Sequence, residues 1–311
     1  MENTPPHLPI MVEEWLSFLE GNLLRLVVDG TLGAGGHAYA VLEAHPEIET
    51  FVGIDRDEYA LSLSRERLAR FGDRLVLLQG NFSDMKELLS SKGIGQVDAI
   101  LLDIGVSSMQ FDLADRGFSF QNEGPLDMRM DRQQSLTAAM ILNEWDEREL
   151  GRIFRDYGEE KFWKRAARAI VEERSKNPFI STKDLANFLE KTLPKKKGKS
   201  IHPATLIFQA LRIAVNDELG ALDDVLPEAI SLLGPGGILG VITFHSLEDR
   251  RVKHYFLQEA SDQQASLGAG IFIDRIPTVE ILTRKPLTAQ EDEVERNPRS
   301  RSAKLRVVRK R

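Results

Sequence analysis

The chain has 311 residues, of which 42% are apolar and 29% charged, a balance typical of a folded globular protein. At about 150 residues per domain, this length indicates about two domains. No apolar run approaches the ~18 residues needed to cross a bilayer, and the polar start MENTPPHLP is unlike a signal peptide. We therefore expect a cytoplasmic protein with no membrane partner.

The chain contains no cysteine. This excludes disulfide scaffolds, cysteine-ligated zinc, iron–sulfur clusters and every mechanism with a thiolate nucleophile. Only six histidines are present, so we expect no metal site. The net charge of −7 does not by itself indicate a nucleic-acid partner, and any RNA contact must depend on local basic clusters.

Apolar strands alternate with helices over the first third of the chain. We expect helices at 12–19, 37–44 and 59–71, and strands at 23–28, 50–54, 74–78 and 97–102. Three of these strands end at an acidic residue: Asp29, Asp55 and Asp103. Apolar strands separated by helices are typical of a parallel sheet covered on both faces, so the sequence predicts an α/β fold.

The alternation stops after Asp103. Residues 105–131 predict a long ordered loop, and residues 137–216 have a helical pattern, with helices at 148–157, 161–174, 182–192 and 204–216. The α/β pattern then resumes, with a helix at 219–233, a strand at 238–244 and a final antiparallel pair at 279–283 and 304–308. We therefore place a sheet domain at 1–110 and 216–311, and an inserted helical domain at 111–215.

A glycine-rich turn lies between the first strand and the next helix. The segment Gly33-Ala34-Gly35-Gly36-His37-Ala38 fits the pattern G-x-G-x-x-G/A, which allows a ligand to approach the backbone closely. Asp55 follows Gly35 by 20 residues, at a strand end where a carboxylate can accept hydrogen bonds from ribose hydroxyls. The alternative is a tight turn with an acidic helix cap. The spacing favours a nucleoside-containing cofactor.

The acidic strand ends bear on which cofactor this is. A dinucleotide places its pyrophosphate on the helix N-terminus, which favours a turn without negative charge nearby. S-adenosylmethionine carries an ammonium and a sulfonium, which favour carboxylates such as Asp29 and Asp103. Phe82 is a candidate to pack against the adenine. Each aspartate alone is explained equally well as the cap of a following turn; together they favour the methyl donor.

Specific motifs extend over the whole chain. They are DGTLGAGGH (29–37), GIDRD (53–57), LLDIGVSS (101–108), RGFSF (116–120), GPLDMRMD (124–131), YGEEKF (157–162), HPAT (202–205), FQALRI (208–213), TFHSLEDR (243–250) and NPRSRSAKLR (297–306). With these motifs the chain resembles the RsmH/MraW family, bacterial S-adenosylmethionine-dependent methyltransferases of small-subunit ribosomal RNA. The segments 195–199 and 258–276 match this family weakly.

The resemblance implies a class I, Rossmann-like methyltransferase with a mostly parallel sheet and an inserted all-helical domain that recognises RNA. It implies methylation of the exocyclic N4 of a cytidine in the decoding region of 16S rRNA, free or in the assembling small subunit, and it leaves a homodimer open. The residues implied to bind the methyl donor are Gly35, Gly36, His37, Asp55, Phe82, Asp103 and Gln110.

The residues agree with N4 as the target. Methylation of cytosine at C5 in RNA normally uses a cysteine that adds to the ring, and this chain has none. N4 needs no covalent intermediate, only an acceptor that holds the amine and stabilises developing positive charge. We expect Asp103 to be that catalytic acceptor, or to lie beside it, with Gly105 giving backbone access. His37 is a candidate general base, although a cofactor contact explains it better.

Three basic clusters are candidates for phosphate contacts: Lys161, Lys164, Arg165 and Arg168 on one helix face; Lys195–Lys197 with Lys199; and the seven Lys and Arg of 299–311. A solvated surface is the competing interpretation, and it is stronger for the helix than for the C-terminal run. The residues expected to frame the base pocket are Arg116, Phe118, Phe120, Arg129 and Met130. His245 and Asp249 either face the target or support it.

Two other functions use the same features. A nicotinamide-dependent oxidoreductase has the same glycine turn, and it predicts protection against heat by NAD instead of by S-adenosylmethionine. An RNA-binding assembly module with a vestigial cofactor fold predicts RNA affinity that Asp103→Ala leaves unchanged, with no methyl incorporation.

Overall fold

The computed structural model describes residues 9–105, 111, 113–194, 202–265 and 272–311. Contacts divide the chain into two compact units, which we name the sheet unit (Met1–Gly105 and Gly220–Arg311) and the helical unit (Val106–Leu219). Each unit has its own apolar core. Among the described helices, none is both long enough and apolar enough to cross a membrane.

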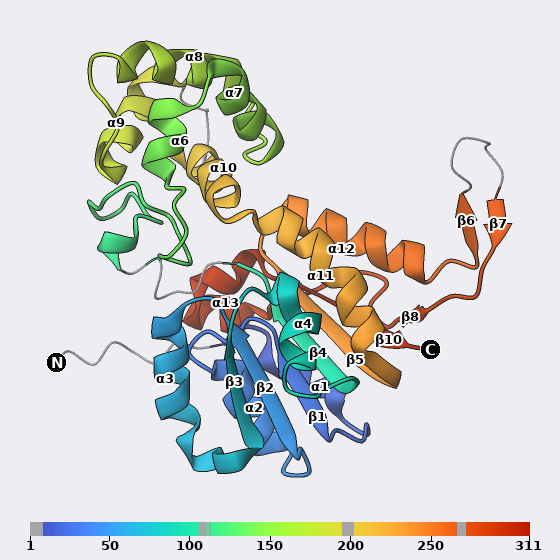
Figure 1. Ribbon diagram of the computed structural model, residues 1–311. Helices are drawn as coiled ribbons and strands as arrows, with labels where there is room; N and C mark the ends of the chain where they lie inside the picture. Colours follow the sequence, from blue (N-terminus) through green and yellow to red (C-terminus); the bar gives the residue numbers. More distant parts are fainter. Residues whose placement is uncertain (1–8, 106–110, 112, 195–201, 266–271) are drawn as a thin grey trace. The chain divides into compact units, whose positions relative to one another are not determined.

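Eight of the described strands form the main sheet, in the order β3-β2-β1-β4-β5-β10-β8, with β9 paired to β10 (Figure 1). The strands are β1 (Leu26–Asp29), β2 (Thr50–Asp55), β3 (Leu75–Gln79), β4 (Val97–Asp103), β5 (Leu233–Thr243), β8 (Val279–Ile281), β9 (Leu287–Thr288) and β10 (Lys304–Lys310). β1 to β5 pair in parallel and β10 pairs antiparallel with β5 and β8. The predicted α/β fold with a mostly parallel sheet is confirmed.

The strand order reverses between β1 and β4. From β1 the chain proceeds outward through β2 to β3, then returns to place β4 on the other side of β1. In open α/β sheets, ligands bind beyond the carboxyl ends of the strands at such a reversal. Asp29 and Asp103 terminate these two strands, so the fold brings both carboxylates to this point.

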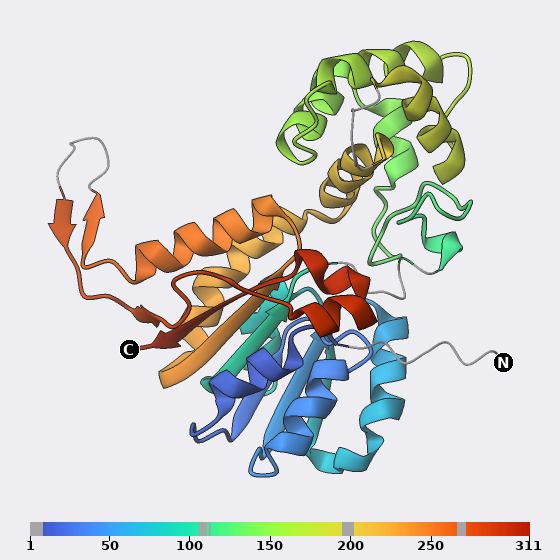
Figure 2. The same cartoon turned by 180° about the vertical axis from the view of Figure 1, so that it is seen from behind.

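Helices cover both faces of this sheet (Figures 1 and 2). Along β1, Val27 packs into the core with α1 (Val12–Leu19), α2 (Gly36–Ala44) and α3 (Glu58–Leu68). Its neighbour Val28 packs into the opposite core with α4 (Met85–Ser90), α11 (Glu218–Leu232) and α12 (Ser246–Glu259). Successive strand residues point to opposite faces, which is why these strands are apolar throughout.

Several predicted boundaries differ from the structure. The helix at 12–19 is confirmed, whereas the helix expected at 59–71 ends at Leu68 and continues as a 3₁₀ turn. The strand expected at 238–244 begins earlier, because Leu233 already pairs with Val97 before a break in register. The break accommodates the turn at 234–237, where Gly236 has φ +84°.

The C-terminal part adds further elements to the sheet unit. The expected antiparallel pair is confirmed as β8 and β10. A separate hairpin joins β6 (Gln263–Ala265) to β7 (Phe272–Asp274), and α13 (Glu291–Arg296) precedes β10. The sequence did not predict α12, β6, β7, β9 or α13.

The helical unit contains α6 (Ala138–Glu144), α7 (Glu147–Asp156), α8 (Trp163–Arg174), α9 (Thr182–Thr192) and α10 (Ala204–Asn216). The bounds expected for the last two helices are confirmed. Side-chain caps fix the starts of α7 and α9: Asp146 and Glu149 form a capping box on α7, and Ser181 accepts the N–H of Asp184 in α9. The apolar faces of these helices enclose one core.

The loop that precedes α6 is held to the helical unit by buried polar contacts. Arg116 is 6% exposed and donates to the carbonyls of Arg129 and Met130. The Asn216 side chain at the end of α10 accepts the N–H of Met130 and donates to the carbonyl of Met128. These bonds satisfy the loop backbone, so an irregular segment is able to lie within a packed unit.

Candidate functional site

The glycine turn connects β1 to α2 in a conformation that favours glycine. Gly33 and Gly35 have φ of +52° and +73°, and Gly35 caps α2. A Cβ added to Gly36 would lie 3.0 to 3.1 Å from the Pro9 ring. The turn therefore brings bare backbone and the first N–H groups of α2 to the reversal point of the sheet.

Asp55 holds this turn from the neighbouring strand. Its Oδ2 accepts the N–H of Gly33 at 2.8 Å and its Oδ1 accepts the N–H of Asp57 at 2.8 Å. Burial raises the pKa of Asp55, while these backbone hydrogen bonds act in the opposite direction. Each carboxylate oxygen can accept a second hydrogen bond, so Asp55 retains capacity for two hydroxyl groups.

Asp29 and Asp103 are joined through Thr31. Oδ1 of Asp29 accepts the backbone N–H of Thr31 at 3.0 Å and its hydroxyl at 3.4 Å, while the Thr31 hydroxyl oxygen accepts the N–H of Asp103 at 2.6 Å. Among the residues that the structure describes, Asp29 Oδ2 and Asp103 Oδ1 are buried without a hydrogen-bond partner. Burial is the main cause that raises the pKa of Asp29 to about 6 and that of Asp103 to about 7.

His37 lies between the turn and β4. Its Nε2 is 2.8 Å from the carbonyl oxygen of Ile10, and its Nδ1 is 3.8 Å from Oδ2 of Asp103. A carbonyl oxygen only accepts, so Nε2 carries the hydrogen and the neutral ring leaves Nδ1 bare. Burial lowers the pKa of His37, with Asp29 acting against this shift.

Two further predicted residues flank this cluster. Phe82 is half-buried and starts a short 3₁₀ turn after β3, where the Arg56 guanidinium lies 5.9 Å from its ring centroid. Gly105 has φ +150°, and a Cβ there would lie 3.0 Å from the Phe244 ring. Gln110, the remaining predicted residue, lies outside the described residues.

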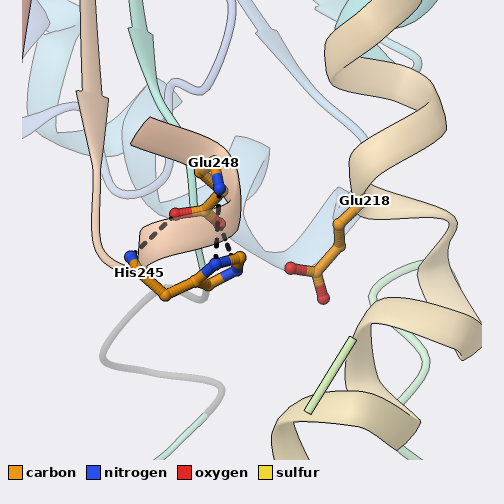
Figure 3. Close-up of side chains that lie close together, drawn as sticks. All are labelled: Glu218, His245 and Glu248. Carbon is orange, nitrogen blue, oxygen red and sulfur yellow. Dashed lines mark hydrogen bonds and ion pairs between the residues drawn. The ribbon is translucent and has the colours of Figure 1, made fainter. Parts of the chain in front are cut away.

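His245 and Glu248 form the capping box that starts α12 (Figure 3). The Glu248 carboxylate accepts the backbone N–H groups of Phe244 and His245, and its Oε1 lies 2.9 Å from His245 Nε2. His245 therefore has a supporting role at the helix start. Glu218, also drawn in Figure 3, pairs with Arg212 of its own unit through two bonds of 2.8 Å.

Three of the five residues expected to frame a base pocket lie inside the helical unit. Arg116, Phe118 and Met130 are at most 8% exposed and belong to the interior of the helical unit. Arg129 is paired with Asp127 through a bond of 2.8 Å from its Nε. Arg129 and Phe120 keep partial exposure, and Phe120 contacts His202 and Phe208 with ring centroids 4.7 and 5.0 Å away. The RGFSF and GPLDMRMD motifs thus stabilise the fold of this unit.

The residues of the basic clusters differ in exposure and in ion pairing. Lys161, Lys164 and Arg165 are exposed at the start of α8, and Arg168 is exposed but paired with Glu172. In the C-terminal run Arg306 is 6% exposed and pairs with Asp249 at 2.7 Å, so the expected RNA contact is wrong for this residue. The basic segment 195–199 lies outside the described residues.

The sequence reasoning missed two residues that organise the site. Thr31 links the two strand ends, and a signal for it exists, because an Asp followed two residues later by Thr is typical of a turn in which the carboxylate accepts the N–H. Ile10 fixes the tautomer of His37 through its backbone carbonyl, and a backbone contact between segments 27 residues apart leaves no mark in the local pattern.

Comparisons with known proteins agree over the full chain. A model of the MraW methylase family matches residues 4–311. Ribosomal RNA small subunit methyltransferase H of Protochlamydia amoebophila is 48% identical over 98% of this chain and 97% of its own length. The protein of the same name from Pelobacter propionicus is 50% identical over 98% of both chains. A solved rRNA methylase from Streptococcus thermophilus, 11% identical, covers 100% of this chain and 98% of its own with a TM-score of 0.42, too low to carry an argument.

Proposed function

The chain belongs to the MraW methylase family, and from that premise we propose that it transfers the methyl group of S-adenosylmethionine to the exocyclic N4 of a cytidine in the decoding region of 16S rRNA. The observation that carries the proposal is the pair of buried acceptor oxygens, Asp29 Oδ2 and Asp103 Oδ1, beside the glycine turn.

The residues of the sheet unit fit the methyl donor. An orphaned buried carboxylate oxygen costs free energy unless a donor or a cation meets it, and the donor's ammonium and sulfonium are such cations. Asp55 has capacity for the two ribose hydroxyls, and Phe82 offers an aromatic face for the adenine. When bound, S-adenosylmethionine supplies an electrophilic methyl group. Gly35, Gly36 and His37 shape the turn against which the donor lies.

Asp103 is the residue assigned to the target base. In this proposal its Oδ1, which is buried without a hydrogen-bond partner, accepts a hydrogen of the N4 amine, orients the nitrogen lone pair and stabilises the positive charge that develops on it. Correct alignment of two reactants supplies about 7–11 kcal/mol of a reaction barrier. Since the chain has no cysteine, covalent addition to the ring, the usual route to C5, has no nucleophile here.

We assign RNA recognition to the helical unit. This unit corresponds to the inserted domain that the sequence predicts at 111–215. Lys164 and Arg165 are exposed in the first turn of α8, and Lys161 is exposed in the turn just before it; basic side chains of this kind neutralise phosphates. Arg299 and Arg301 of the sheet unit are exposed as well and extend the candidate contacts. The target cytidine must leave its stack for chemistry on its amine.

The test is a methylation assay with labelled S-adenosylmethionine and small ribosomal subunits from cells that lack this activity, followed by nucleoside analysis. We expect label in N4-methylcytidine, and a loss of label with Asp103→Ala. Label on C5 or on ribose refutes the position. No label on subunits or on free 16S rRNA refutes the enzyme and favours an assembly module, whereas heat protection by NAD alone indicates an oxidoreductase.

A further inference from the structure

Two carboxylates and one imidazole lie close together at the ends of β1 and β4. Asp29 is 1% exposed and His37 is 6% exposed, whereas the Asp103 side chain is 19% exposed with its Oδ1 buried. Thr31 connects the two aspartates, as its hydroxyl donates to Asp29 and accepts the N–H of Asp103. In such a cluster the protonation of one group depends on the others.

The charged groups that face this cluster are predominantly acidic. On Asp29, His37 favours the ionised carboxylate, whereas Asp103 and Asp55 oppose it. Ionisation of Asp103 is opposed first by burial and then by the negative charge of Glu248 in α12. Toward His37 the facing acids are Asp103, whose Oδ2 lies 3.8 Å from Nδ1, Asp29 and Glu293. Glu293 belongs to α13 and accepts the N–H of Met11.

His37 is unsuited to neutralise the two aspartates. Donation from Nε2 to the Ile10 carbonyl uses the only hydrogen of the neutral ring, and the Nδ1 that faces Asp103 is an acceptor. Because burying two negative charges together is unfavourable, the two neighbouring carboxylates retain a proton while His37 is neutral.

We propose that Asp29 and Asp103 together hold a proton in the free enzyme and release it to solvent when S-adenosylmethionine binds, so that this pair distinguishes the cationic methyl donor from its product S-adenosylhomocysteine. The inference rests on the methyl donor proposed above. The ammonium and sulfonium replace the proton as the positive charge beside the carboxylates. Once the methyl group has left, the sulfur is neutral, part of this charge is lost, and the pair regains a proton from solvent.

The consequence is an affinity ratio that depends on pH. Proton release makes binding of the donor weaken as the pH falls, by up to tenfold per pH unit for each proton released. The product retains the ammonium but lacks the sulfonium, so it displaces less of the proton and its affinity changes less with pH. The preference for donor over product therefore increases from pH 5.5 to pH 8.

Isothermal titration calorimetry at pH 6.5 in phosphate and in imidazole buffer counts the protons released, since the two buffers differ in ionisation enthalpy. With folded-state pKa values of about 6 and about 7, the pair holds about one proton at this pH. We expect about one proton released with S-adenosylmethionine and clearly less with S-adenosylhomocysteine. Asp29→Asn should reduce the release and flatten the pH dependence, while Asp73→Asn, which alters an exposed carboxylate of the same unit, should not.

Binding heats that are identical in the two buffers, with normal affinity for the donor, overturn the proton release but leave the methyl donor in place. Absence of binding in every buffer overturns the proposed function and this inference with it. Carboxyl ¹³C NMR of the free protein provides the second measurement, with Asp29→Asn for assignment. Two aspartates that titrate above pH 5 are expected, and titration of both below pH 5 contradicts the inference.

Discussion

Oδ2 of Asp55 accepts the backbone N–H of Gly33 at 2.8 Å, which ties the end of β2 to the glycine turn after β1. The same carboxylate accepts the N–H of Asp57 through Oδ1, so it also fixes the start of α3. One side chain thus orders the backbone around the site and keeps acceptor capacity for hydroxyl groups. Asp55 therefore supports the glycine turn and also offers acceptor oxygens to a ribose.

Asp55→Ala should weaken binding of S-adenosylmethionine, because ribose hydroxyls lose a charged acceptor and the turn loses its support. A hydrogen bond to a charged group contributes about 1.5–3 kcal/mol, which corresponds to a roughly 10- to 150-fold increase in Kd. Isothermal titration calorimetry measures this change in Kd. Asp55→Asn keeps one acceptor oxygen and should give an intermediate Kd. Wild-type affinity in Asp55→Ala would remove this residue from the site.

Asp29→Asn should stabilise the free protein at pH 8. Burial raises the pKa of Asp29 to about 6 from 3.8, so the folded state holds the proton more tightly than the unfolded state does. The resulting contribution is fully present below about pH 4 and is lost as the pH rises through about 6. A shift of two pKa units corresponds to about 3 kcal/mol of folding free energy. The Asp29→Asn variant does not lose this stability as the pH rises, because its side chain does not titrate.

Thermal unfolding from pH 4 to pH 8 measures this difference. The variant should gain stability over the wild type as the pH rises through this window, while its affinity for S-adenosylmethionine falls. Asp73→Asn serves as the exposed control. An Asp29→Asn protein that is no more stable than the wild type at pH 8 would show that the buried carboxylate is solvated or paired in solution.

The strand ends were predictable from the sequence because apolar strands and acidic termini are local features. Asp29, Asp55 and Asp103 each occupy the last position of a strand, as expected. The start of α12 was not found, because His245 is not among the residues that usually cap a helix. Glu248 three positions later is the signal that was present, since it completes the capping box.

Long-range ion pairs left no local signal. Arg306 reads as part of a basic run, yet Asp249, 57 residues earlier, pairs with it at 2.7 Å. Likewise Arg116 and Met130 of the loop before α6 resembled surface residues around a pocket, and only the packing shows that they lie inside. Charge clusters in a sequence identify basic residues but not which of them are free to meet a phosphate.

Arg306→Met should destabilise the fold without changing RNA affinity per folded molecule. Asp249 is 14% exposed and, among the residues that the structure describes, keeps the Lys304 ion pair when Arg306 is removed. Breaking a buried pair costs about 3–5 kcal/mol. Lys304→Met, which removes a 37% exposed partner, should cost clearly less. Chemical denaturation measures both. Equal effects of the two variants would contradict the assignment of Arg306 as the main partner.

Replacing Lys161, Lys164 and Arg165 by glutamate should weaken RNA binding and flatten its dependence on salt. Each lost phosphate contact lowers the slope of log K against log salt by about 0.7–0.9, so three contacts lower it by about 2–3. Filter binding at several salt concentrations measures the slope. Lys92→Glu, on an exposed turn of the sheet unit, is the control. A wild-type slope in the triple variant would assign this face of α8 to solvent.

A crystal structure with S-adenosylmethionine bound tests the central claim most directly. We predict that the donor lies beside Gly33–Gly36, with its ribose on Asp55 and its methyl group directed toward Asp103. Density for the donor at any other place, or none at saturating concentration, would contradict the account.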